Sequence, residues 1–60
     1  MPSDETRRQL KLFGVAVTNL EDAIDGRAPV EEITRLDADL ADRTREVIAF
    51  VDRLRSRRIL

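Results

Sequence analysis

The stretch Asp25-Gly26-Arg27-Ala28-Pro29 decides the fold, because only here in the 60-residue chain do a glycine and a proline lie close together between two long amphipathic runs. Glycine readily adopts the left-handed backbone that ends a helix, so we expect Gly26 to be the left-handed residue of this stretch. Pro29 has a preset φ and lacks an N–H that a first-turn residue would not use, which suits the start of a second helix. The sequence therefore predicts an all-α fold, an antiparallel helical hairpin of two helices.

The residues before this stretch predict one helix, from about position 4 to position 25. Ser3 is a suitable N-cap, and Asp4 and Glu5 follow where the helix dipole favours negative charge. The apolar residues have the alternating three- and four-residue spacing of a helix that packs against another helix. They are Leu10, Phe13, Val17, Leu20 and Ile24, with Leu12, Ala16 and Ala23 beside them. This stripe is broad enough to face two neighbouring helices.

Gly14 lies in the middle of this helix, where it costs roughly 1 kcal/mol relative to alanine. Either the packing tolerates this glycine or the glycine allows another helix to approach closely. The β-branched residues between positions 10 and 17 also permit a short strand. We expect a helix, because the heptad spacing continues to Ile24 and the chain offers no second strand for pairing.

The residues after the turn predict a second helix, from position 29 or 30 to about position 57. Glu31 and Glu32 lie in its first turn, where they suit the helix dipole. Its apolar positions are Ile33, Leu36, Leu40, Val47, Phe50 and Leu54, with Ile48 and Val51 beside them. Between Leu40 and Val47 the inward position falls on Arg43 or Thr44, so the middle of this helix offers little apolar bulk.

Folding the chain at the turn predicts which residues face each other. Val17 should lie opposite Leu40, and the large ring of Phe13 should lie opposite the thin region of the second helix. Phe50 should lie opposite Thr6. This pairing of large with small residues supports the register.

Two helices of about 33 Å and 42 Å cannot cover this much apolar surface by themselves. The second helix extends beyond the first, so we expect the first helix to cover Phe50, Val51, Leu54 and the tail Ile59-Leu60 poorly. We therefore predict a homodimer of hairpins, a four-helix bundle, with a larger protein as the other candidate partner. The predicted association face consists of Leu10, Phe13, Val17, Leu20, Leu40, Val47, Phe50, Val51 and Leu54.

The composition argues against catalysis. Histidine, cysteine, tryptophan and tyrosine are all absent, so the usual general base and the commonest metal ligands are missing. We expect no catalytic residue, no cofactor and no metal site, and we assign Asp37, Asp39 and Asp42 to a solvated face. Ion pairs should form between Asp39 and Arg43 and between Glu31 and Arg35. The chain has no apolar run of about 20 residues and begins with polar residues, so we expect a cytoplasmic protein without membrane contact.

Charge is distributed unevenly along the predicted hairpin. Acidic residues gather near the turn, whereas seven basic residues come together at the open end: Arg7, Arg8, Lys11, Arg53, Arg55, Arg57 and Arg58. Three interpretations are open: complementing the helix dipole and aiding solubility, docking onto a larger protein, or contacting nucleic-acid phosphates. The isoelectric point near 5.3 and the single lysine disfavour nucleic acid.

Two resemblances accompany these patterns. The short hairpin that self-associates resembles the plasmid repressor-of-primer proteins, which dimerise and bind paired RNA loops; this likeness is one of architecture and carries no residue roles. The pattern Val17, Leu20, Glu21, Gly26 and Val30-Glu31-Glu32-Ile33 resembles the helix-turn-helix centre of the exonuclease VII small subunit. In that family the leucine-glutamate pair leads almost directly into the glycine, whereas here residues 22–25 intervene. The second resemblance implies a small accessory subunit of a larger enzyme.

These observations together favour a small non-catalytic module for protein interaction or regulation that self-associates through its heptad faces. The alternatives are a nucleic-acid-binding regulator that uses the basic open end, and an accessory subunit of a larger enzyme.

Overall fold

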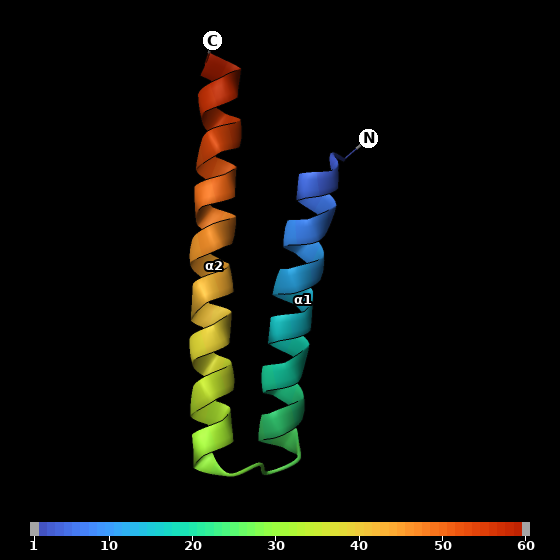
Figure 1. Ribbon diagram of the computed structural model, residues 1–60, viewed down its shortest axis with the longest axis vertical. Helices are drawn as coiled ribbons and strands as arrows, with labels where there is room; N and C mark the ends of the chain where they lie inside the picture. The colour runs from blue at the N-terminus through green and yellow to red at the C-terminus, as the bar shows by residue number, and fades with distance from the viewer. Residues whose placement is uncertain (1, 60) are drawn as a thin grey trace.

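The computed structural model describes residues 2–59 and consists of two antiparallel helices joined by one turn (Figure 1). Helix α1 spans Asp4–Asp25, the range expected from its cap and its heptads, and helix α2 spans Val30–Ile59, two residues more than expected at its end. Both termini lie at the same end, and α2 extends beyond α1. The predicted helical hairpin is confirmed. The described residues contain no strand, so the alternative of a strand between positions 10 and 17 is wrong.

Ser3 caps the start of α1 as predicted. Its backbone is extended, and its Oγ accepts a hydrogen bond of 3.1 Å from the backbone N–H of Thr6. At the start of α2, the carbonyl oxygen of Pro29 accepts hydrogen bonds from the N–H groups of Glu32 and Ile33 at 3.0 and 3.1 Å. These contacts satisfy groups that a helix end otherwise leaves unpaired.

The turn closes with a different residue in the left-handed conformation from the one predicted. Gly26 has φ −83° and ψ 2°, whereas Arg27 has φ 56°. The N–H of Ala28 donates to the carbonyl of Ala23 at 2.9 Å, and the N–H of Arg27 donates to the carbonyl of Ile24 at 3.1 Å. This is a Schellman motif, which requires its left-handed residue one position after the helix cap. Because α1 continues to Asp25, that position falls on Arg27.

The helices pack along one heptad seam from each. The seam of α1 consists of Thr6, Gln9, Phe13, Ala16, Leu20 and Ala23, and the seam of α2 consists of Ile33, Leu36, Leu40, Arg43, Val47 and Phe50. Among the described hydrophobic residues only Phe50 is buried, with 7% of its surface exposed, and no described side chain is completely buried. The hairpin therefore has a contact line between two helices and almost no interior.

The seam of α1 differs from the predicted one. Leu10, Val17 and Ile24 are exposed, at 65%, 40% and 53% of their surface, and Gln9, Ala16 and Ala23 take their places against α2. The two stripes share Phe13 and Leu20 and have the same spacing, so spacing alone does not distinguish them. Small alanines allow two helices to approach closely, and the larger side chains are then left on an outer face.

The predicted register agrees with the structure in the levels at which residues of the two helices lie along the hairpin, although Val17 is outside the seam. Val17 and Leu40 line the same groove, and Arg53 of α2 reaches Glu5 of α1 with a distance of 2.6 Å between Nη2 and Oε1. The expectation that α1 covers Phe50 poorly is wrong, because the first turn of α1 shields that ring. Leu54 is exposed as expected, whereas Leu60 and the side chain of Ile59 lie outside the described residues. In the described part of the chain, neither helix is long and apolar enough to cross a membrane.

Candidate association surface

The hairpin is one helix thick, and this thickness determines where a partner can bind. Its dimensions are 48 × 19 × 12 Å, so the shortest dimension corresponds to one helix and the two others define two broad faces. No described element covers either broad face (Figure 1). Helical domains normally bury such a face against a second layer.

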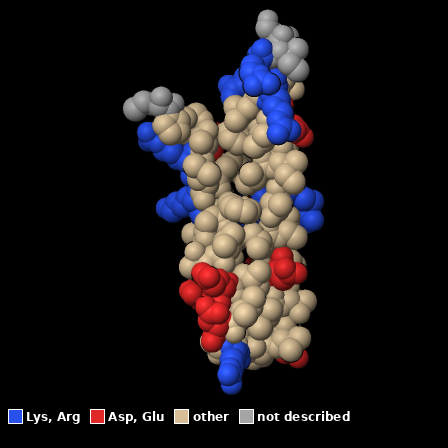
Figure 2. Space-filling view, turned by 180° about the vertical axis from the view of Figure 1, so that it is seen from behind, with Lys and Arg blue, Asp and Glu red and all other residues tan. Residues whose placement is uncertain are grey.

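One broad face is apolar. On α1 it carries Leu10, Val17 and Ile24, which are seven residues apart and so lie in one stripe. On α2 it carries Leu40, which lines a groove together with Val17, and the exposed Ile48. We call these five residues the outer apolar face. Figure 2 shows a largely uncharged band along the middle of this face, with basic side chains at the open end and at the turn.

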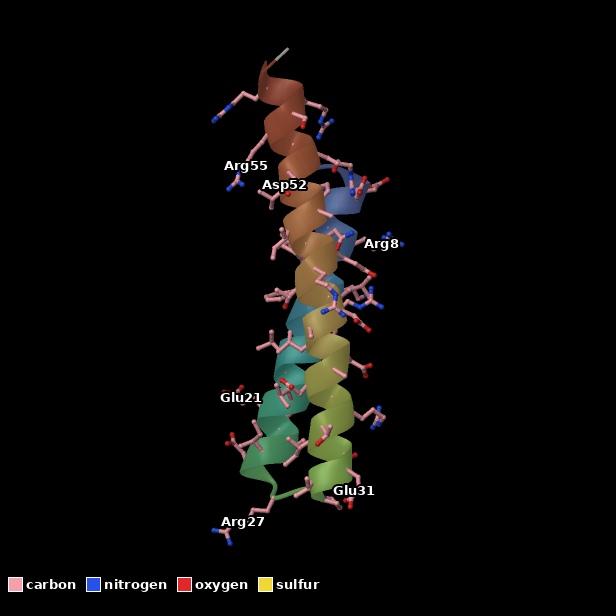
Figure 3. All side chains as sticks on the ribbon, turned by 90° about the vertical axis from the view of Figure 1, so that its left-hand side faces the viewer. Arg8, Glu21, Arg27, Glu31, Asp52 and Arg55 are labelled. Carbon is pink, nitrogen blue, oxygen red and sulfur yellow. The ribbon has the colours of Figure 1, made fainter. Side chains whose placement is uncertain are left out.

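Figure 3 confirms that α1 and α2 contribute to the same side. Glu21 lies one helical turn after Val17, and Arg55 lies two turns after Ile48, so each labelled residue marks the side of the helix on which that apolar residue lies. Figure 3 shows Glu21 and Arg55 pointing to the same side. Arg8 and Glu31 point to the opposite side. The exposed apolar residues of the outer apolar face therefore lie on the same side of the two helices.

A groove crosses the outer apolar face near the turn. It has a volume of about 220 Å³ and lies between Val17, Leu20 and Ile24 of α1 and Leu40 of α2, with Glu21 and Asp25 on its rim. Its floor is formed by aliphatic side chains, which suits another aliphatic side chain better than a polar ligand.

The opposite broad face is polar. Its grooves, of about 320 and 510 Å³, are lined partly by aliphatic residues but also by Asn19, Asp39, Arg43, Asp22, Glu32 and Arg35. Arg35 lies 3.8 Å from Asp39 and 3.9 Å from Glu32, and Arg43 lies 2.7 Å from Glu46. This face can remain in water without cost.

The ion pairs of α2 differ from those predicted. Arg43 pairs with Glu46 instead of Asp39, and Arg35 pairs with Glu32 and Asp39 instead of Glu31. The partners are the carboxylates that reach each guanidinium along the polar face. In the described residues no group of three or more acidic side chains converges as a metal site would require.

The predicted basic cluster is divided between two sides of the open end. Arg8 and Arg55 point in opposite directions (Figure 3). Arg53 is engaged with Glu5 and places its guanidinium carbon 5.6 Å from the centre of the Phe50 ring, and Arg55 lies 3.4 Å from Asp52. In the described part of the chain, no ion pair involves the remaining basic residues of this end, which are Arg7, Arg8, Lys11, Arg57 and Arg58. The open end is basic, but its charges form no single patch.

The residues of the predicted association face fall into two groups. Three are exposed and available to a partner, namely Leu10, Val17 and Leu54. The others are buried or half-buried. Phe13, Leu20, Leu40, Val47 and Phe50 lie in the seam between α1 and α2, and Val51 follows Phe50 directly. Leu40 is half-buried in the seam and also lines the outer groove.

Sequence reasoning missed Ile24 and Ile48 as members of the outer face and Gln9 as a seam residue. Gln9 is 6% exposed, and its Oε1 has no hydrogen-bond partner among the described residues. Gln9 shares the heptad spacing of positions 6, 9, 13, 16, 20 and 23. Because Gln9 is polar, this stripe looks less apolar in the sequence than the neighbouring stripe predicted to face α2.

Comparison with known protein families, characterised proteins and solved structures yields no match for this chain.

Proposed function

We propose that this hairpin is a non-catalytic interaction module that acts by self-association through its outer apolar face. The observation that carries the proposal is the surface area. A folded monomer of 6.9 kDa exposes about 4,000 Å² by the general scaling of area with mass, whereas this hairpin exposes 4969 Å². The excess of roughly 1,000 Å² is comparable to what one partner contributes to a stable interface, about 800 Å².

The distribution of that surface supports the same proposal. Four of the seven large hydrophobic residues exposed in the described part of the chain lie on one broad face: Leu10, Val17, Ile24 and Ile48. The other broad face carries Val15 and the ion pairs of Arg35 and Arg43. Exposed apolar residues scattered singly need no explanation, but a continuous band of them marks an interaction surface.

A matched pair of valines tests the proposal. Val17 lies on the outer apolar face at 40% exposure, and Val15, at 49%, lines a groove of the opposite face. Light scattering over a dilution series, with helicity followed by circular dichroism, should show a helical dimer in the parent protein. Val17→Lys should weaken association at least roughly tenfold, because it places a charge in an apolar contact, whereas Val15→Lys should not. Equal effects of the two substitutions, or a stable monomer at high micromolar concentration, would contradict the proposal.

The second candidate function is binding of an anionic partner at the open end. It is favoured by the five basic residues of that end that lack an ion pair in the described part of the chain, Arg7, Arg8, Lys11, Arg57 and Arg58. A salt-sensitive gel shift with RNA or DNA, lost when Arg53, Arg55, Arg57 and Arg58 are replaced by serine, would support nucleic-acid binding. Loss of a co-purifying protein from the same variant, with no gel shift, would instead support docking onto a larger protein.

A further inference from the structure

We infer that the outer apolar face is occupied by a second copy of the chain in an antiparallel arrangement, with α1 of one copy against α1 of the other. The inference rests on the proposed self-association and adds the orientation and the contacts. Two arrangements are available to two such faces. A two-fold axis perpendicular to the helices places α1 on α1, whereas an axis parallel to the helices places α1 on α2.

The spacing of the apolar stripe on α1 suits the first arrangement. Leu10 and Ile24 each lie seven residues from Val17, about 10 Å along the helix. A perpendicular two-fold axis through Val17 therefore places Val17 of one copy against Val17 of the other. The same axis places Leu10 of each copy against Ile24 of the other. Every large exposed residue of this stripe then gains an aliphatic neighbour.

The charges beside the stripe distinguish the two arrangements. Toward the turn, Glu21 and Asp25 form the rim of the groove, and toward the open end the basic residues Arg7 and Lys11 flank the same helix. Figure 2 shows acidic side chains beside the band near the turn and basic ones beside it toward the open end. Antiparallel packing brings Glu21 of one copy within about 3 Å, along the helix axis, of the level of Lys11 of the other. Unlike charges therefore meet on both sides of the axis.

The parallel arrangement brings like charges together. With both turns at the same end, Glu21 and Asp25 of α1 would lie beside the α2 helix of the second copy near Asp37. Asp37 is eleven residues, or three helical turns, before Ile48 and so lies on the same side of α2. The basic open ends would likewise meet each other. Charge complementarity therefore selects the antiparallel dimer.

The position of Val17 sets the area that such a dimer buries. Val17 lies eight residues, about 12 Å, before the end of α1, so the axis pairs roughly the half of each 48 Å face that lies next to the turn. With a width of 19 Å this half encloses roughly 450 Å² per copy, so the dimer interface is smaller than a standard interface of about 800 Å² per partner. The resulting assembly has two layers of two helices, which gives the apolar residues the second layer that the hairpin alone lacks.

Disulfide cross-linking measures the orientation, because the natural chain contains no cysteine. Val17→Cys should form a covalent dimer under mild oxidation, and Val15→Cys, on the opposite face, should not. A mixture of the Leu10→Cys and Ile24→Cys proteins should form the mixed dimer, whereas Ile24→Cys alone should not, because its two copies lie about 21 Å apart along the helix. Cross-linking of Ile24→Cys with itself, or no cross-linking of Val17→Cys, would overturn the antiparallel arrangement.

Charge reversal provides an independent measurement on the dimer. Glu21→Lys should raise the dissociation constant about tenfold at low salt, because it places two lysines together at two symmetric contacts. The double variant Lys11→Glu with Glu21→Lys should restore dimerisation. These two residues lie about 15 Å apart on one helix, so such a rescue can only act between copies. A tighter dimer in Glu21→Lys would indicate contact with Asp37 of the second copy and overturn the inference.

The measurements separate this inference from the proposed function. A dimer that Val17→Lys disrupts, without the Val17→Cys cross-link, overturns the antiparallel arrangement and leaves self-association standing. A protein that stays monomeric at all concentrations overturns both.

Discussion

Arg27 holds a left-handed backbone in a position that favours glycine. A side chain in this conformation costs roughly 1 kcal/mol or more relative to glycine, because its Cβ approaches the neighbouring carbonyl. The Schellman hydrogen bonds of Arg27 and Ala28 hold it there.

Arg27→Gly should therefore raise the free energy of unfolding by about 1 kcal/mol, measured by urea denaturation. Gly26→Ala is the matched control. Its φ of −83° suits any residue, but a Cβ there would lie 3.0 Å from the carbonyl oxygen of Asp22, so this substitution should bring no gain. If Gly26→Ala raised the free energy of unfolding and Arg27→Gly did not, the left-handed backbone would not lie at Arg27.

Gln9 places a polar group in the seam, where its Oε1 lacks a hydrogen-bond partner in the part of the chain that the structure describes. A buried acceptor without a partner costs about 1 to 3 kcal/mol, so Gln9→Leu should stabilise the hairpin by about 1 kcal/mol. Gln9→Glu, which puts a charge at the same place, should destabilise it. Thermal unfolding of the three proteins measures both effects, and an unchanged midpoint in both variants would mean that Gln9 lies in water.

At the scale of the elements, α1 contains a glycine that packing within the hairpin does not require. A Cβ built on Gly14 meets no atom of the described residues within 4 Å, so α2 does not approach this residue. Gly14→Ala should stabilise α1 by about 1 kcal/mol through helix propensity alone. Circular dichroism during thermal unfolding should show a higher midpoint, and a lower midpoint would indicate that another helix packs closely against Gly14.

The two phenylalanines of the seam should contribute unequally. Phe50 is buried under the first turn of α1, beneath the guanidinium of Arg53, whereas Phe13 is half-buried. Phe50→Ala should cost about 3 to 5 kcal/mol, which is most of the stability of so small a domain, and Phe13→Ala should cost less. Denaturation of both variants measures the order, and a larger cost for Phe13→Ala would place the centre of the seam nearer the thin region of α2.

At the scale of the whole molecule, stability should depend on association. A hairpin with one buried hydrophobic residue among those described gains little free energy from its own interior. If the folded dimer is the stable species, the melting temperature should rise with protein concentration, because mass action favours it. A melting temperature independent of concentration from low micromolar to millimolar would show that the isolated hairpin is stable by itself.

The sequence by itself determined the two helices, their limits to within two residues and their antiparallel arrangement. Those features depend on local signals: the Ser3 cap, the Gly26 to Pro29 turn and the heptad repeats. A cap or a turn acts through the hydrogen bonds and φ values of a few neighbouring residues, so it can be read without knowledge of the rest of the chain.

Only the tertiary structure decided which side of α1 faces α2. Two overlapping heptads share Phe13 and Leu20, and their other members are adjacent residues, roughly 100° apart around the helix. The choice between them depends on how closely the two helices approach, which is a property of the pair. Ala16 and Ala23 take the close contact, and Leu10, Val17 and Ile24 are left on the outer face that carries the proposed association.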